Sequence, residues 1–236
     1  MEIGKNIRLM AISTSTVYGS DFLVYIRDRI ADFTGEKQIL FIPYARPSGI
    51  SYDDYTSNVS QALASLGIAV RGIHEFENPA QAIRESSSIF TGGGNTFLLL
   101  KTLQEKGLLS VLKQEIEKGK PYVGTSAGSN LTGLTISTTN DMPIVYPQGF
   151  DALQILPFNI NPHYLDPDPN STHKGETRET RIQEFHVYNA QPVLGIREGS
   201  WLEVEHGQVV LAGNLTARLF RQGATPVELS PGQIDF

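Results

Sequence analysis

One pentapeptide of the chain, Gly124-Thr125-Ser126-Ala127-Gly128, has the G-x-S-x-G pattern of a serine nucleophile. The apolar pair Tyr122-Val123 before it predicts a strand, and Ser129-Asn130-Leu131 after it predicts the start of a helix. Between a strand and a helix, such a pentapeptide forms a strained turn that exposes the serine hydroxyl and needs small neighbours. The pattern therefore predicts Ser126 as a nucleophile, with a purely structural turn as the alternative.

A glycine run, Gly92-Gly93-Gly94-Asn95, stands between a predicted strand over 88–91 and a helical segment over 96–100. Glycines at such a junction let the backbone approach a ligand and direct N–H groups at it. The run lacks the Lys-Ser/Thr ending of a phosphate-binding loop, so we favour one half of an oxyanion hole over a nucleotide site. A tight structural turn is the remaining alternative. The backbone N–H of Ala127 is the other predicted donor to an oxyanion.

A serine nucleophile needs a base, and five histidines are available. His163 ends the segment Asn159-Ile160-Asn161-Pro162-His163, where the proline favours a loop at the end of a strand. Functional residues gather in such loops at the carboxyl ends of strands in α/β sheets. We therefore favour His163 as the base. The other histidines are His74, the main rival after a predicted strand over 68–73, and His173, His186 and His206.

Two acids compete to orient the base. Asp141 gives the order Ser, Asp, His along the chain, and Glu198 follows an apolar run at 193–196 and precedes Gly199. Sequence order cannot choose between them, because the same catalytic constellation occurs in several orders on unrelated folds. Each acid also has a structural alternative, as a loop-bracing residue or an exposed charge.

A helical segment over 176–189 begins shortly after His163 and carries Arg178 and Arg181 on one face. An arginine near the site would bind a substrate carboxylate through two parallel hydrogen bonds. The alternative is a surface helix with ordinary ion pairs, because Glu176, Glu179 and Glu184 stand among the arginines.

The elements that position these residues alternate between short apolar runs and helical patterns. Buried parallel strands are predicted at 9–12, 39–42, 68–73, 88–91 and 122–123, with helical patterns at 22–33, 55–66 and 108–116. This order predicts an α/β fold, a mostly parallel sheet sandwiched by helices. Closely spaced runs at 193–196, 201–204, 209–211 and 218–220 predict an antiparallel C-terminal meander. We expect one domain over residues 1–236.

Composition narrows the class of partner and of chemistry. A net charge of −6, with scattered basic residues, disfavours binding to nucleic acid, and no apolar run is long enough to span a membrane. The chain has no cysteine and no secretory h-region, so we expect a cytoplasmic protein. Histidines and carboxylates do not show zinc-ligand spacing, so we expect neither a metal nor another cofactor.

Several segments in order resemble the peptidase E family, the aspartyl dipeptidases among serine peptidases. They include Ile42-Pro43-Tyr44-Ala45, the glycine run continued to Phe97, the serine pentapeptide, 138–145, Gly149-Phe150-Asp151-Ala152-Leu153, Asn161-Pro162-His163, 173–178 and Glu198-Gly199. The resemblance implies a fold similar to class I glutamine amidotransferases and hydrolysis of small acidic dipeptides, Asp-Xaa. We also allow for a homodimer.

The resemblance also implies roles for single residues. Ser126 would be the nucleophile, His163 the base, Gly94 and Ala127 the oxyanion donors, and Arg178 the ligand of the substrate's side-chain carboxylate. Glu198 is favoured as the acid on His163, with Asp141 placed nearby for the substrate's amino group.

The chain departs from the family pattern at Thr125 and Ser129, beside the nucleophile, where Thr125 is expected to enlarge or rehydrate the pocket. A broader esterase, a cyanophycinase-like hydrolase and a non-enzymatic binding protein on the same scaffold are the alternatives.

Overall fold

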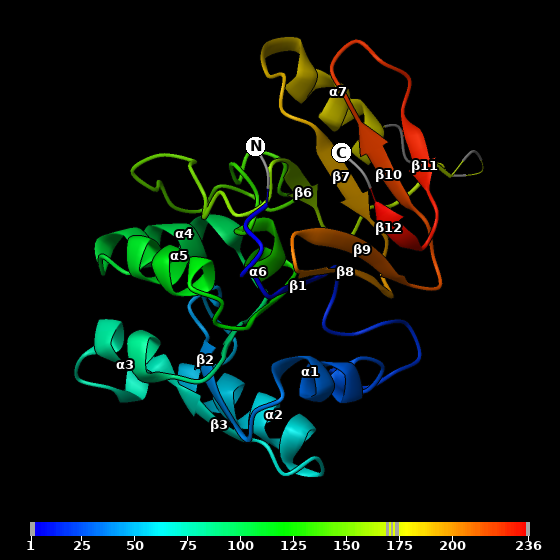
Figure 1. Ribbon diagram of the computed structural model, residues 1–236. Coiled ribbons are helices and arrows are strands. Elements are labelled where there is room, and N and C mark those ends of the chain that lie inside the picture. The colour runs from blue at the N-terminus through cyan, green and yellow to red at the C-terminus, as the bar shows by residue number, and fades with distance from the viewer. Residues whose placement is uncertain (1–2, 169, 171, 173–174, 235–236) are drawn as a thin grey trace.

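An eight-stranded sheet forms the centre of the protein (Figure 1). The computed structural model describes residues 3–168, 170, 172 and 175–234. In this part of the chain the strand order is β12-β9-β8-β1-β5-β4-β2-β3. The strands are β1 (Leu9–Ile12), β2 (Gln38–Ile42), β3 (Ala69–Gly72), β4 (Ile89–Thr91), β5 (Tyr122–Thr125), β8 (Ser200–Glu205), β9 (Gln208–Gly213) and β12 (Gly232–Ile234).

The inner strands are parallel and are buried on both faces, as is usual for parallel strands in α/β folds. β1 pairs in parallel with β5, β5 with β4, and β4 and β3 with β2, whereas β8, β9 and β12 continue the sheet in antiparallel fashion. Alternate residues of β1 enter different apolar layers: Leu9 and Ala11 pack on one face, and Met10 and Ile12 on the other. The predicted α/β fold with a mostly parallel sheet is confirmed.

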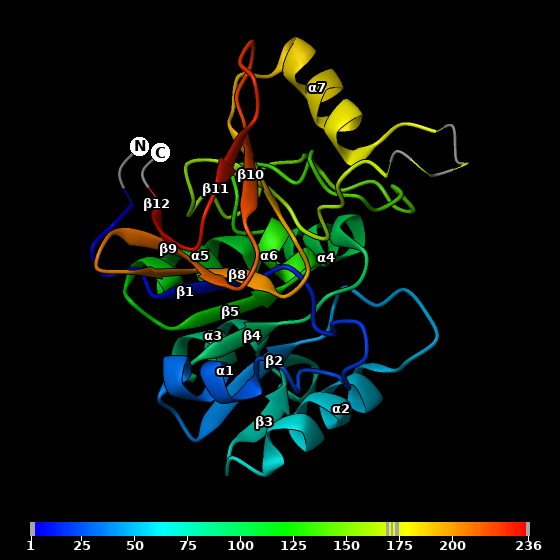
Figure 2. The same ribbon diagram turned by 90° about the vertical axis from the view of Figure 1, so that its right-hand side faces the viewer.

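Helices lie on both faces of this sheet, as Figure 2 shows for α1 and α2 on one side and α4, α5 and α6 on the other. The bounds are α1 (Arg27–Thr34), α2 (Tyr52–Ala64), the 3-10 helix η1 (Ile73–Glu75), α3 (Pro79–Glu85), α4 (Thr96–Glu105), α5 (Leu109–Glu117) and α6 (Ala127–Asn130). The first helix begins later than its apolar pattern predicts, because Leu23 has a left-handed backbone with φ 61°. None of the described helices is long and apolar enough to cross a membrane.

A second sheet stands above the helical layer that contains α6 (Figure 2). Its order is β11-β10-β7-β6, with β6 (Asn159–Asn161), β7 (Val193–Ile196), β10 (Ala217–Phe220) and β11 (Val227–Leu229), and α7 (Arg178–Tyr188) covers it. β6 and β7 are parallel. The predicted antiparallel C-terminal strands are confirmed, since β8 pairs with β9 and β7 with β10 in antiparallel fashion. The prediction that they form one meander is wrong, because β8 and β9 belong to the central sheet and β7 and β10 to the second.

Candidate active site

The serine turn lies at the carboxyl end of β5, where the strand passes directly into α6. Ser126 has a strained backbone with φ 52° and ψ −107°. A Cβ at Gly124 would meet the backbone of Gly128, and a Cβ at Gly128 would meet the carbonyl oxygen of Thr91. Both glycines are thus required by close packing, and the turn exposes the hydroxyl of Ser126 as the pentapeptide predicts.

His163 links this hydroxyl to a carboxylate. The Oγ of Ser126 lies 2.8 Å from Nε2 of His163, and Nδ1 of the same ring lies 2.6 Å from Oε1 of Glu198. A carboxylate only accepts hydrogen bonds, so Nδ1–H donates to Glu198 and leaves Nε2 free to accept from the serine. The three side chains come from the turn after β5, from the loop after β6 and from the loop after β7. The arrangement can activate a hydroxyl for attack on a carbonyl carbon.

The base is held by a serine that sequence reasoning missed. The backbone N–H of His163, whose φ is 54°, donates to Oγ of Ser13 at 2.9 Å, and Ser13 in turn donates to the carbonyl oxygen of Ile196 at 2.7 Å. Ser13 is fully buried at the end of β1. Its position directly after a buried strand was the only available signal, and that signal is weak without a partner in view.

Asp141 lies apart from the base, at the start of α4. Its Oδ2 accepts hydrogen bonds from the backbone N–H of Thr96 at 2.7 Å, from the Thr96 hydroxyl at 2.6 Å and from the Thr139 hydroxyl at 3.1 Å. The N-terminus of a helix favours a negative charge there. Of the two acids that the sequence left open, the structure brings Glu198 to His163.

Arg178 is the first residue of α7 and lies in a hollow with Leu165, Thr177 and Arg181. Burial lowers its pKa, as does the neighbouring Arg181, whereas the charge of Asp141 raises it. The guanidinium forms no ion pair or hydrogen bond within the described residues, although Arg181 pairs with Glu176 at 4.0 Å. Arg178 is therefore a partly desolvated cation near an anionic side chain, without an acceptor among the described residues.

The glycine run lies against the nucleophile. A Cβ added to Gly93 would be 3.1 Å from Cβ and 3.7 Å from Oγ of Ser126. Gly94 has φ 143°, and a Cβ there would meet the carbonyl oxygen of Ala45. Its N–H donates to no acceptor in the described chain, unlike the N–H of Asn95, which donates to Ala45 at 2.7 Å. Ala127 begins α6, so its N–H is also without an intrahelical partner.

The two residues that depart from the family pattern are buried. Thr125 is fully buried, and its hydroxyl has no hydrogen-bond partner among the described residues. The structure therefore places this hydroxyl in the interior, and the expected enlargement or rehydration of the pocket by Thr125 stays a prediction. The Oγ of Ser129 lies 2.7 Å from the carbonyl oxygens of both Ile12 and Gly124, where it joins β1 to β5.

The rival histidines lie elsewhere or make structural contacts. His74 contacts Asp53 through Nε2 at 2.9 Å, His186 contacts the carbonyl oxygen of Gln191 at 3.0 Å, and His206 stands in the turn between β8 and β9. His173 lies outside the described residues. Within the described residues, no group of three or more histidine, aspartate or glutamate side chains is arranged to hold a metal ion.

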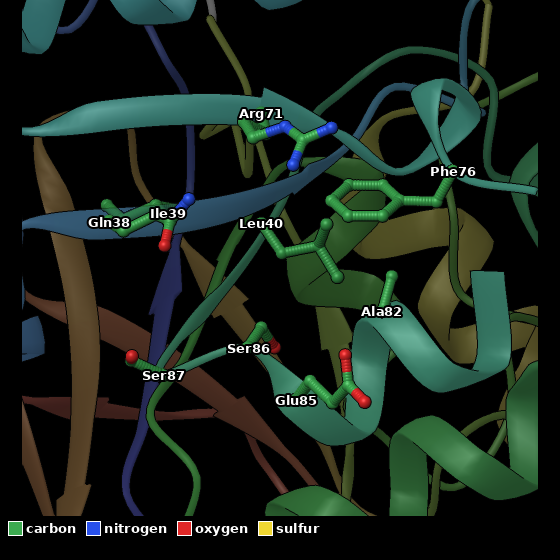
Figure 3. Close-up of a pocket in the computed structure, with 9 residues that line it drawn as sticks. All are labelled: Gln38, Ile39, Leu40, Arg71, Phe76, Ala82, Glu85, Ser86 and Ser87. Carbon is green, nitrogen blue, oxygen red and sulfur yellow. The ribbon is translucent and has the colours of Figure 1, made fainter. Parts of the chain in front are cut away.

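Another hollow lies between β2, β3 and α3, away from the serine (Figure 3). Arg71 projects into it, but its guanidinium packs over the ring of Phe76 at 4.1 Å and pairs with Glu75 at 3.6 Å. Neither Ser126 nor His163 lines this hollow. The chemistry-bearing groups are therefore at the carboxyl end of β5.

Known proteins resemble this chain over nearly its whole length. Residues 9–212 match peptidase family S51. Peptidase E of Streptomyces coelicolor is 48% identical over 225 residues, which are 95% of this chain and 91% of that protein. A probable alpha-aspartyl dipeptidase of Drosophila melanogaster is 44% identical and covers 94% of this chain and 93% of its own length. Peptidase E of Salmonella typhimurium is 44% identical, with 95% and 98% covered.

Solved structures support the fold. A peptidase from an acI-B1 actinobacterium covers 100% of this chain and 98% of its own with a TM-score of 0.73 at 16% identity. The crystal structure of a protein described as a putative peptidase E from Listeria monocytogenes covers 88% and 98%, with a TM-score of 0.67 at 24% identity. The resemblance drawn from the sequence motifs is confirmed, and the chain belongs to peptidase family S51.

Proposed function

We propose that the protein hydrolyses dipeptides with an N-terminal aspartate, Asp-Xaa, through an acyl-enzyme on Ser126. The observation that carries the proposal is the alignment of three groups: His163 contacts Ser126 at 2.8 Å on one ring nitrogen and Glu198 at 2.6 Å on the other. Family membership and the relatives named peptidase E and alpha-aspartyl dipeptidase support the same activity.

The chemistry follows from these contacts. Nε2 of His163 takes the hydroxyl proton as Oγ of Ser126 bonds to the aspartyl carbonyl carbon, and Glu198 stabilises the imidazolium. The C–N bond then breaks, and the leaving amine takes the proton from His163. Water then gives a proton to His163 and attacks the ester carbonyl carbon. The bond to Oγ of Ser126 breaks, Oγ takes the proton back from His163, and aspartate is released. No cofactor takes part in this scheme.

The N–H groups of Gly94 and Ala127 are proposed to stabilise the oxyanion of both tetrahedral intermediates. Each is a backbone donor without a partner in the described chain. Ala127 directly follows Ser126, and Gly94 directly follows Gly93, which packs against Ser126. Donors fixed in position before reaction need no reorganisation as the charge develops, and losing one raises the barrier by about 3–4 kcal/mol.

Specificity for aspartate is assigned to two charges. Arg178 would bind the side-chain carboxylate, and a neutral side chain would leave this partly buried cation unpaired. Asp141 would bind the substrate's ammonium group through Oδ1, because its three hydrogen bonds within the described chain all end on Oδ2. The need for a free ammonium group excludes internal aspartates of longer chains.

Three further expectations stand with this proposal. Residues 1–236 are proposed to form one domain. A cytoplasmic location is proposed because the chain has no cysteine to form a disulfide. A homodimer is an assembly to be tested by sedimentation, and the expected partner is the small acidic peptide.

The proposal is tested by following the hydrolysis of Asp-Leu, Asn-Leu and Ala-Leu by the wild type and by Arg178→Ala. We expect cleavage of Asp-Leu alone, and a rise in KM of at least tenfold in Arg178→Ala. Arg71→Ala is the matched control, because it removes an arginine that pairs with Glu75 in the separate hollow away from the serine. Equal cleavage of all three peptides, or an unaltered KM in Arg178→Ala, would refute the assigned specificity.

A further inference from the structure

A buried tyrosine lies behind the glycine run, on the side away from the nucleophile. Tyr55 of α2 is 2% exposed, and its hydroxyl donates to the carbonyl oxygen of Gly93 at 3.2 Å. The proposed scheme gives this side chain no part in the reaction. Its target, however, is the peptide that carries the N–H of Gly94.

The geometry of a peptide makes this contact consequential. A trans peptide is planar, and its C=O and N–H point in opposite directions. A hydrogen bond to the Gly93 carbonyl therefore fixes the direction of the Gly94 N–H. Two consecutive glycines would otherwise leave this plane free to rotate, since neither residue has a Cβ to restrict it. The hydrogen bond to the Gly93 carbonyl also polarises the peptide group, which makes the Gly94 N–H a stronger donor.

Close packing holds the tyrosine in this place. Its ring meets that of Phe41 edge-on with centroids 4.9 Å apart, and the guanidinium of Arg46 lies over it at 4.7 Å. A Cβ added to Gly92 would lie only 2.6 Å from the Tyr55 hydroxyl and 2.8 Å from the ring of Phe41. The glycine at 92 is thus needed to admit the tyrosine, whereas Gly93 admits Ser126 on the other side.

We propose that Tyr55 is a positioning residue for the oxyanion hole, which holds the Gly93–Gly94 peptide so that its N–H faces the reacting carbonyl. This inference rests on the proposed role of Gly94. It extends the catalytic apparatus from the loops at the sheet edge to a side chain of α2, on the face of the sheet opposite to α6.

The direct test is Tyr55→Phe, which keeps the ring packing and removes the hydroxyl. Complete loss of an oxyanion donor costs about 10²–10³-fold in kcat, so a loosened donor is expected to cost about tenfold. KM for Asp-Leu should stay within twofold of the wild-type value, because Arg178 is unaltered. The pH midpoint of kcat should stay within about 0.2 units of the wild-type value, because His163 is unaltered. Thr56→Val is the matched control: its hydroxyl donates to Tyr52 at 2.7 Å in the same helix, away from the glycine run.

A second readout is independent of aspartate recognition. A fluorophosphonate labels an activated serine and places its phosphoryl oxygen in the oxyanion hole. We expect Tyr55→Phe to be labelled about tenfold more slowly than the wild type, and Thr56→Val at the wild-type rate. If the wild type is labelled but does not cleave Asp-Leu, the substrate assignment fails and the labelling rates still decide the role of Tyr55. Labelling of Tyr55→Phe within twofold of the wild type would overturn the inference, as would slow labelling shared equally by Thr56→Val.

Discussion

The hydroxyl of Ser13 accepts a hydrogen bond from the backbone N–H of His163 at 2.9 Å, across 150 positions of sequence. The same hydroxyl donates to Ile196 at 2.7 Å, two residues before Glu198. Ser13 thus links, through two hydrogen bonds, the segment that carries the base to the segment that carries the acid. The strained φ of 54° at His163 is stable only because such contacts determine it.

Removal of the Ser13 hydroxyl tests how much catalysis depends on these two hydrogen bonds. In Ser13→Ala the N–H of His163 and the carbonyl of Ile196 lose a fully buried partner, which should lower the free energy of unfolding by about 1–3 kcal/mol. We expect kcat to fall at least tenfold with KM nearly unaltered, measured well below the unfolding transition. Ser20→Ala serves as the control, because the Ser20 hydroxyl makes only an exposed hydrogen bond, to the carbonyl oxygen of Asp21. A wild-type kcat in Ser13→Ala would show that the loop positions His163 unaided.

The two acids should respond differently to neutralisation. Glu198→Gln removes the charge that stabilises the imidazolium of His163, and we expect kcat to fall by about 10²–10⁴-fold. Asp141→Asn removes the proposed ligand of the substrate ammonium and should act mainly on KM. Steady-state kinetics of both variants at pH 7 separate the two roles. The assignment of the acids would be reversed if Asp141→Asn lost kcat and Glu198→Gln kept it.

An ion-pair cluster beside the site makes stability depend on acid pH. Arg197 binds Asp166 at 2.6 and 2.7 Å and Glu228 at 2.9 and 3.0 Å. Hydrogen bonds from Arg197 lower the pKa of both carboxyl groups, although burial opposes the shift. A lowered native pKa gives stability that is present above the unfolded values of about 4 and is lost as pH falls through the native values.

Arg197→Met should therefore lose less stability than the wild type between pH 7 and pH 3. Urea unfolding at both pH values measures this difference, and 1 M salt should reduce it because both carboxylates are half-exposed. An equal loss in the two proteins would mean that Asp166 and Glu228 do not contribute to the acid dependence.

Short sequence patterns predicted those parts of the site that are formed by residues adjacent in the chain. The serine turn and the glycine run each depend on a few adjacent small residues, and their neighbours fix the strand and helix on either side. His163 was predicted from its place after a strand, and the structure places it against Ser126. Residue order and spacing did not choose the acid, and Glu198 was favoured only through the family resemblance. The distance from His163 to Glu198 depends on how β6 and β7 pair, and nothing near either residue encodes that pairing.

The C-terminal strands show why their division between two sheets could not be predicted from the sequence. β8 alternates between buried and half-exposed residues, as an antiparallel strand does, but all four residues of β7 are buried. That difference reflects a strand covered on both faces, by α7 and by the central core. Spacing alone treats the two strands alike. Ser13 and Tyr55 were missed for a related reason: each acts through a partner far away in the chain.

The most direct test of the account is kcat/KM for Asp-Leu in the wild type, Ser126→Ala and Ser137→Ala, the last being a serine exposed in a loop. We predict wild-type activity in Ser137→Ala and a loss of at least 10³-fold in Ser126→Ala, because removal of a nucleophilic serine can lower kcat by about 10⁶-fold. Asp-Leu hydrolysis that persists in a folded Ser126→Ala would contradict the acyl-enzyme mechanism, and an inert, folded wild type would contradict the assigned substrate.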